Sequence, residues 1–219
     1  MTGEGDQIRI MVVDDHDLFR TGLRRLLDEE PGLRVVAEAR SGEEALRHAS
    51  ELRPQVVVMD VGMPGMSGVE ATRRLLAAKP PPGVLMLTVS DSDEVVLDAI
   101  LGGAAGYLLK DAPLSEIVRG VRATAAGESL IAPSVSGSLL ARLRRHDPHQ
   151  APDAPPRLSP RELEVLRLMV EGYGNSEIGR HLHLSPSTIK NQVSSTLDKL
   201  GVENRIQAAV LAVRLGLLD

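Results

Sequence analysis

Short apolar runs alternate with amphipathic stretches over the first part of the chain. The runs are rich in Val, Ile, Leu and Met, as expected of parallel strands that are buried on both faces. Between them, apolar residues recur every three or four positions, as on amphipathic helices. The alternation predicts an α/β fold, a five-stranded parallel sheet doubly wound by helices in the flavodoxin-like manner. The predicted strands are 8–13, 35–39, 56–59, 84–89 and 106–109.

The pattern changes after residue 133. Residues 134–156 are rich in Ser and Pro, which is typical of a linker, although 138–145 has helical spacing. Residues 157–219 return to helical spacing and contain no strand-like run. Ser159, Pro160 and Glu162 form a capping-box start for the first of these helices. We therefore predict an α/β domain at 1–133, a linker with a helical extension at 134–156 and a small all-α domain at 157–219.

Composition narrows the choice of protein class. The chain is 42% hydrophobic and 25% charged, which allows a real core, and it has no cysteine. Disulfide frameworks and thiolate metal sites are therefore excluded, and we expect a cytoplasmic protein because neither a signal peptide nor an apolar membrane span is apparent. The net charge of −5 comes mostly from the first domain. The last domain is nearly neutral, so charge alone does not indicate nucleic-acid binding.

Polar residues follow the predicted strands at their carboxyl ends, where ligands bind in open parallel sheets. Asp14 and Asp15 follow the first strand, Asp60 the third, Thr88 lies in the fourth and Lys110 follows the fifth. Three carboxylates suit Mg²⁺, and a carboxylate can itself accept a phosphoryl group. A single Asp after a strand is usually only a turn or cap residue, so the interpretation depends on all five side chains meeting.

Four segments carry a resemblance to a known family. VVDDHDLFR, VVMDVGMPGMSG, LMLTVS and GYLLK resemble the receiver domain of two-component response regulators of the NarL/FixJ group, over about residues 8–131. The resemblance implies that Asp60 accepts phosphate from the phosphohistidine of a sensor histidine kinase. It also implies that Asp14, Asp15, Asp60 and the Gly62 carbonyl hold Mg²⁺.

The same resemblance assigns the residues around the phosphate. Lys110 would contact the phosphoryl oxygens, Thr88 would hydrogen-bond them, and Tyr107 would be the switch aromatic that moves inward with Thr88. Val89 departs from the family, which commonly carries a small residue there, and we expect it to hinder access or slow phosphate loss. Asp17 is interpreted as first-turn helix charge only.

The last domain contains a helix-turn-helix pattern. A short helix from residue 175 is followed by a turn, and Ser185 and Pro186 then begin a longer helix to about residue 200. Ile189, Val193 and Leu197 form its core-facing stripe. The apolar periodicity alone fits a helical protein-interaction domain as well as it fits a DNA-binding domain.

Residues 158–218 resemble the LuxR-type DNA-binding domain almost throughout. By position, Lys190, Asn191 and Ser194 match base-facing sites, while Thr188 and Gln192 match sites near phosphates. Many members carry His where this chain has Gln192. The order of receiver, linker and LuxR-type domain implies a transcription factor that binds double-stranded DNA.

The final predicted helix, 205–215, offers two interpretations. We expect Ile206, Val210 and Val213 to face the domain, which leaves a second face of small residues. That face is either extra core packing or, as the resemblance implies, a dimer interface, with a homodimer on half-sites about 10 bp apart. Its residues are Ala208, Ala209, Leu211 and Ala212.

Together these features predict a phosphorylation-controlled transcription factor rather than a turnover enzyme. One rival is a Mg²⁺-dependent phosphohydrolase with an aspartyl nucleophile. Such enzymes typically carry their nucleophile on the first strand, whereas Asp60 ends the third. The other rival is a receiver-containing factor that responds to a ligand or partner without phosphate.

Overall fold

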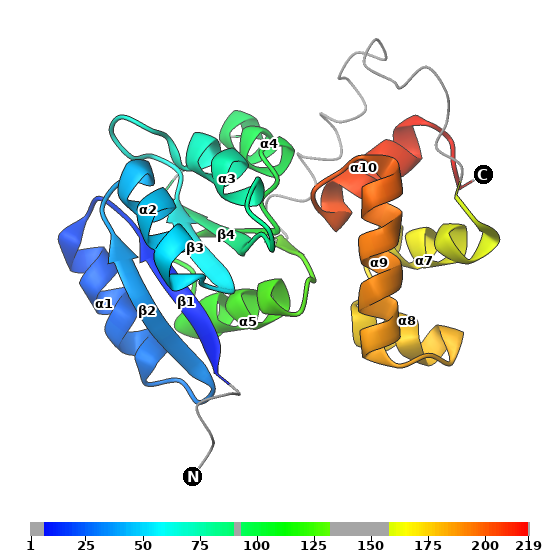
Figure 1. Cartoon of the computed structure of the whole chain (residues 1–219), viewed down its shortest axis with the longest axis horizontal. Coiled ribbons are helices and arrows are strands. Elements are labelled where there is room, and N and C mark those ends of the chain that lie inside the picture. The colour runs from blue at the N-terminus through cyan, green and yellow to red at the C-terminus, as the bar shows by residue number, and fades with distance from the viewer. Residues whose placement is uncertain (1–6, 90–92, 132–157, 219) are drawn as a thin grey trace.

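The computed structural model describes residues 7–89, 93–131 and 158–218. In the first domain, strands and helices alternate, and the five predicted strands are confirmed within two residues at each end (Figure 1). The elements are β1 (Ile8–Val13), α1 (Asp17–Asp28), β2 (Leu33–Ala39), α2 (Gly42–Leu52), β3 (Val56–Asp60), α3 (Gly68–Leu76), β4 (Gly83–Thr88), α4 (Asp93–Leu101), β5 (Gly106–Leu109), α5 (Leu114–Ala125) and β6 (Leu130–Ile131).

The sheet is parallel, with strand order β2-β1-β3-β4-β5-β6. β6 was not predicted, because two residues are too few to produce a periodic signal. Alternate residues of the central strands enter two apolar layers: Met11 and Met59 pack with α2, α3 and α4, whereas Val12 and Val58 pack with α1 and α5. The doubly wound fold is therefore confirmed, with both faces of the sheet covered.

The described part of the last domain is all-helical. It comprises α7 (Pro160–Val170), α8 (Asn175–Leu182), α9 (Pro186–Leu200) and α10 (Arg205–Arg214). The predicted capping box at Ser159 and Glu162 is confirmed, and Ser185 Oγ caps α9 by accepting a hydrogen bond from Thr188 N. Ile189 and Val193 are buried in the domain core and Leu197 packs against it, as their spacing predicts. The linker at 134–156, including its helical extension at 138–145, lies outside the described residues.

The proposed outer face of α10 needs a correction. Ala208 and Ala212 are fully buried in the core of their own domain, so the prediction that they face outward is wrong. Ala209 and Leu211 are half-buried. Ile206, which was expected to face its own domain, packs instead against the apolar cluster of the α/β domain. A stripe of small residues therefore supplies core packing, and at most part of it remains for a partner.

Candidate functional site

The carboxyl ends of β1, β3, β4 and β5 bring the predicted acidic residues and the lysine to one edge of the sheet. Their parallel register pairs Val13 with Met59, and Asp60 with Leu87, so the first and third strands end side by side. Asp14 and Asp60 are only 1% and 4% exposed. Two nearly buried carboxylates at one edge require positive charge close by.

Lys110 supplies that charge. Its ammonium Nζ lies 2.7 Å from Asp14 Oδ2 and 2.8 Å from Asp60 Oδ2, and it also lies 4.9 Å from the centre of the Phe19 ring. Burial lowers the pKa of Lys110, but its hydrogen bonds to Asp14 and Asp60 outweigh burial and leave that pKa above its usual value. The lysine is therefore held as a cation between two acids.

The rest of the cluster is more open. Carboxylate oxygens of Asp14, Asp15 and Asp60 and a ring nitrogen of His16 all lie within 4.8 Å of one another. Asp15 Oδ1 is shielded from solvent yet accepts no hydrogen bond, although His16 Nδ1 lies 3.0 Å away. Three carboxylates and one lysine leave two negative charges. An oxygen-rich donor set of that charge fits a divalent hard cation.

The loop after β3 holds Asp60 in place. Gly62 N donates a hydrogen bond to Asp60 Oδ1 at 3.3 Å. Gly65 has a positive φ of 78°, which supplies the turn. Gly68 begins α3 so close to β3 that a Cβ there would lie 2.0 Å from the Asp60 carbonyl oxygen. Only glycine allows α3 to begin so close to the acid.

The residues expected around the phosphate differ in how far they are exposed to solvent. Thr88 is 3% exposed at the end of β4, and Val89 beside it is 86% exposed. Tyr107 is 0% exposed and belongs to the apolar cluster under α2, α3 and α4. The ring of Tyr107 therefore occupies the interior in this structure, and its inward movement between two states stays a prediction.

Two neighbours of the cluster were missed in the sequence. Arg20 is buried at 6% exposure and donates to the Asp14 carbonyl oxygen at 2.7 Å. The Arg20 guanidinium also donates a hydrogen bond to the exposed Asp17 carboxylate, and this bond lowers the pKa of Asp17. Asp17 thus belongs to the support of the β1 loop. His16 was the second omission, although its place next to two acids was a visible signal.

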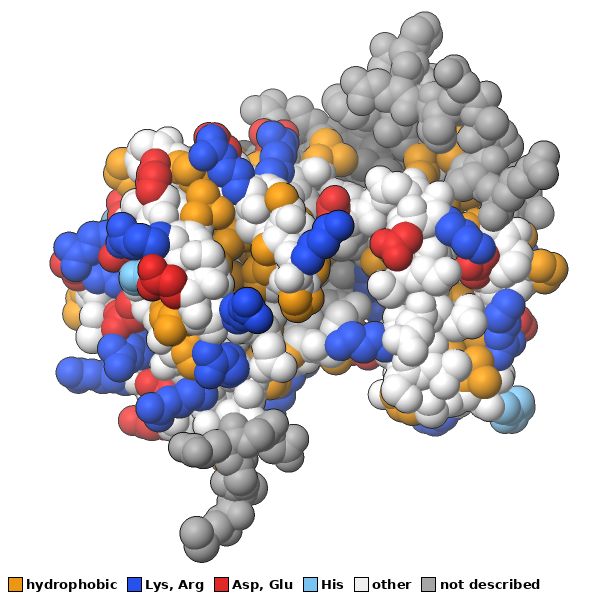
Figure 2. Space-filling model, in the orientation of Figure 1, with side chains coloured by type: hydrophobic (Ala, Val, Ile, Leu, Met, Phe, Trp, Pro, Cys, Tyr) orange, Lys and Arg blue, Asp and Glu red, His pale blue; other side chains and the backbone are white. Residues whose placement is uncertain are grey.

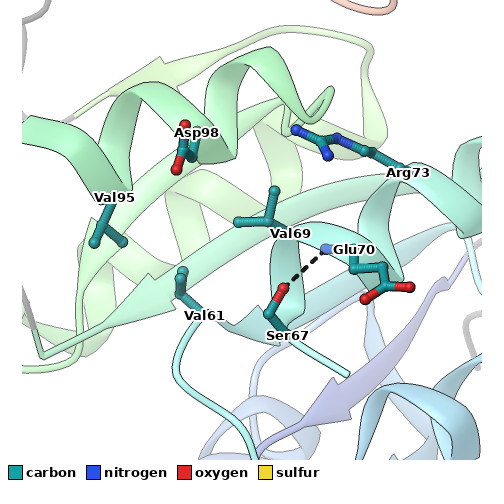
Figure 3. Close-up of a pocket in the computed structure, with 7 residues that line it drawn as sticks. All are labelled: Val61, Ser67, Val69, Glu70, Arg73, Val95 and Asp98. Atoms are coloured by element: carbon teal, nitrogen blue, oxygen red, sulfur yellow. Dashed lines mark hydrogen bonds between the residues drawn. The ribbon is translucent and has the colours of Figure 1, made fainter. Parts of the chain in front are cut away.

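A groove lies beside the cluster rather than over it. Its floor contains Val61, the residue after Asp60, and it separates part of α3 from α4 (Figure 3). Val69 and Arg73 project from α3, while Val95 and Asp98 project from α4. The groove therefore runs between α3 and the side of α4 that carries Val95 and Asp98.

The last domain presents a polar helix to solvent. Lys190, Asn191 and Ser194 are exposed on α9, whereas Thr188 and Gln192 are half-buried. Figure 2 shows charged side chains scattered over the α/β domain and a largely uncharged surface over α9. The exposed face can hydrogen-bond, but it carries little charge to attract a polyanion.

Glu162 fixes the orientation of that helix. Its carboxylate caps α7 through Ser159 and accepts hydrogen bonds from Ser195 and Lys199 of α9, at 3.0 and 2.8 Å. The hydrogen bond from Lys199, followed by that from Ser159 N, lowers the pKa of Glu162 to about 2. A buried acid therefore ties the start of α7 to the C-terminal half of α9.

Comparison with known proteins identifies both domains. Residues 10–122 match the family described as the response regulator receiver domain, and residues 156–212 match bacterial regulatory proteins of the luxR family. The chain therefore belongs to the two-component response regulators of the NarL/FixJ type, which join these two domains. It is a transcription regulator with a receiver and a LuxR-type DNA-binding domain. No helix among the described residues has the length and hydropathy to cross a membrane.

The similarity extends over nearly the whole chain. The transcriptional regulatory protein LiaR of Bacillus subtilis (strain 168) is 40% identical over 209 residues, which cover 94% of this chain and 97% of LiaR. The response regulator ChrA of a heme-sensing two-component system has 37% identity and a TM-score of 0.54, covering 97% of this chain and 99% of ChrA. The RcsB–DNA complex has 27% identity and a TM-score of 0.57, with 97% and 100% coverage.

Proposed function

We propose that this chain is switched by phosphorylation of Asp60 and that the switch controls its binding to DNA. In this proposal residues 1–133 form the receiver, 134–156 the linker and 157–219 the DNA-binding domain. The observation that carries the proposal is the position of Lys110, with its ammonium between the Asp14 and Asp60 carboxylates and Asp15 alongside. A site built this way can neutralise charge that arrives on Asp60.

Asp60 acts as the nucleophile toward the phosphohistidine of a sensor histidine kinase. One carboxylate oxygen attacks phosphorus, the phosphorus–nitrogen bond breaks, and the kinase imidazole leaves with the electron pair. Lys110 turns from the carboxylates to the new phosphoryl oxygens, and the Thr88 hydroxyl donates to one of them. These residues contribute mainly by placing positive charge and a hydrogen-bond donor at the phosphoryl group, because phosphoryl transfer needs little covalent help.

Asp14, Asp15, Asp60 and the Gly62 carbonyl would hold Mg²⁺. The solvent-shielded Asp15 Oδ1, which accepts no hydrogen bond, and the excess of carboxylates over cations support this assignment. When bound, Mg²⁺ supplies positive charge to the phosphoryl oxygens. Asp15 and His16, which are more exposed than Asp14, lie on the solvent side of the cluster.

The DNA-binding domain would place α9 in a major groove, as helix-turn-helix proteins do. Lys190, Asn191 and Ser194 would face bases, with Thr188 and Gln192 near phosphates. The weakly charged surface supports weak binding by one copy and stronger binding by a homodimer on paired half-sites. Ala209 and Leu211 are the candidate residues of α10 for that contact.

The test loads the full chain with beryllofluoride and Mg²⁺, which mimic the phosphoryl group, and compares the chain with Asp60→Asn. Dimerisation is measured by sedimentation, and DNA binding by selection from random duplexes. We expect both to increase in the loaded chain and to stay at the basal level in Asp60→Asn. Equal behaviour of the two proteins would reject the switch, and sustained turnover of phosphate esters would favour a phosphohydrolase instead.

A further inference from the structure

His16 belongs to the acidic cluster but has no role in the proposed function. One donor atom from each of Asp14, Asp15, His16 and Asp60 lies within 4.8 Å of the other three. The three acids of this set are the ones to which we assign Mg²⁺. The His16 side chain is 70% exposed, so its ring lies on the side of the cluster that is open to solvent.

Capping of α1 does not account for the His16 ring. His16 is the residue before α1, with extended backbone angles of φ −82° and ψ 103°, and its side chain makes no capping hydrogen bond. Ser, Thr, Asp and Asn are the usual residues at this position, because their short side chains reach the first free amides of the helix. His16 N donates instead to Asp14 Oδ1 at 2.9 Å, which folds the turn back so that the ring lies beside the acids.

The contact between His16 and Asp15 has the length of a hydrogen bond but not its direction. His16 Nδ1 lies 3.0 Å from Asp15 Oδ1, yet this solvent-shielded oxygen accepts no hydrogen bond. His16 Nδ1 also lies 3.4 Å from Asp14 Oδ1. Two ligands at right angles on an ion lie about 3.0 Å apart when each metal–ligand bond is about 2.1 Å long. The nitrogen and the two oxygens are therefore spaced like neighbouring ligands of one ion.

Lys110 leaves the oxygens beside His16 to an ion. Its ammonium contacts Oδ2 of Asp14 and Oδ2 of Asp60, at 2.7 and 2.8 Å. The oxygens that lie next to His16 Nδ1 are Oδ1 of Asp14 and Oδ1 of Asp15. The lysine and the imidazole thus contact different oxygens of Asp14, so both can act at once. An imidazole ligand adds a nitrogen donor to this oxygen-rich set without adding negative charge.

A nitrogen donor changes which ion suits the site. Mg²⁺ is bound through oxygen and keeps several waters, whereas divalent ions of the first transition row bind mixed sets of carboxylate and imidazole. We propose that His16 Nδ1 is a ligand of the receiver's metal ion, so that the site prefers a divalent transition-metal ion to Mg²⁺. The inference rests on the proposed function for the place of the ion, and it adds a ligand and a class of ion.

The test compares Mn²⁺ with Mg²⁺, because Mn²⁺ suits carboxylate oxygens as Mg²⁺ does but also accepts nitrogen ligands. Calorimetry measures the Kd of each ion for the full chain and for His16→Phe, which keeps a planar ring without nitrogen. We expect the Kd of Mn²⁺ to rise at least about tenfold in His16→Phe, since even the loss of an indirect partner of a metal ligand typically costs that much. The Kd of Mg²⁺ should change less than about threefold, because water can replace the ring in its coordination.

His181→Phe is the matched control. It makes the same change on an exposed ring of α8, in the DNA-binding domain. The His181 ring lies 4.8 Å from the ring of Tyr173, and a phenyl ring can keep that contact. Because His181 is no part of the acidic cluster, the Kd values of both ions should equal those of the wild type.

Electron spin echo spectroscopy of the chain loaded with Mn²⁺ identifies the ligand directly. The wild type should show modulation from a nitrogen nucleus bound to Mn²⁺, and histidine labelled with the heavier nitrogen isotope should change its frequency. His16→Phe should lack this modulation, whereas His181→Phe should keep it.

Four results would overturn the inference. Bound Mn²⁺ without histidine modulation, or a Kd of Mn²⁺ in His16→Phe within about twofold of wild type, would exclude the ligand. Equal loss of affinity for both ions would give the ring a structural role only, and tighter binding of both would make it a competitor of the metal. In all four cases the wild type still binds an ion, and the metal site of the proposed function stands. A wild type that binds neither ion overturns that metal site together with the inference.

Discussion

Removal of the Lys110 charge tests whether the lysine ammonium stabilises the two buried acids beside it. Lys110→Met keeps the apolar stem but leaves Asp14 and Asp60, which are 1% and 4% exposed, without the ammonium that lies within 2.8 Å of each. Removal of one partner from a buried ion pair costs about 3–5 kcal/mol. Because the lysine side chain is itself 9% exposed, we take the lower end, about 3 kcal/mol. For a domain of this size that lowers the melting temperature by roughly 10 °C or more.

The assay is urea denaturation of the full chain in a chelator, followed by titration with Mg²⁺. Magnesium at 100 times its dissociation constant should return about 2.7 kcal/mol to Lys110→Met. The double variant Lys110→Met, Asp60→Asn should be more stable without metal than Lys110→Met alone, because one unpaired acid is gone. If Lys110→Met without metal unfolds within about 0.5 kcal/mol of the wild type, Lys110 does not stabilise the two buried acids.

Two further predictions concern supporting residues. Gly68→Ala should cost at least about 2 kcal/mol in thermal unfolding, because its Cβ would lie 2.0 Å from the Asp60 carbonyl, whereas Gly62→Ala, with open space, should be nearly neutral. Glu162→Gln should cost about 1–2 kcal/mol at pH 7, since Lys199 holds the pKa of Glu162 near 2, below its unfolded value of 4.5. The stability that Glu162 contributes is present above pH 4.5 and is lost as pH falls through 2. In denaturation curves recorded over a pH series, Glu162→Gln should therefore lose less stability in acid than the wild type does. Equal dependence of unfolding free energy on pH in the two proteins would contradict the prediction.

The geometry of the acidic edge could be predicted from the sequence because strand topology alone determines it. Asp14, Asp60 and Lys110 each follow a buried run, and parallel strands in one sheet end at one edge. Their convergence did not depend on side-chain detail. Arg20 was missed because its role requires that α1 fold back over the β1 loop, which periodicity alone does not indicate.

The faces of α10 could not be predicted in the same way. Ala208 and Ala212 share the size and polarity of the half-buried Ala209, so the apolar spacing fits more than one orientation of the helix. The orientation is decided by tertiary contacts, since the receiver takes Ile206 and Asn204 caps the helix. The hydrogen bonds from Asn204 and Gln207 to the α/β domain leave no periodic signal in the sequence, because Asn and Gln at a helix start are equally common on solvent-facing turns.

Phosphorylation of Asp60 is tested most directly by mapping the residue that carries the phosphoryl group. The full chain is phosphorylated by acetyl phosphate with Mg²⁺, reduced with borohydride to mark the acyl phosphate, and mapped by peptide mass spectrometry. We expect one modified residue, Asp60, and we expect chelation of the metal to abolish the mark. A mark on Asp14 or Asp15, or no mark while the protein remains folded, would contradict this expectation.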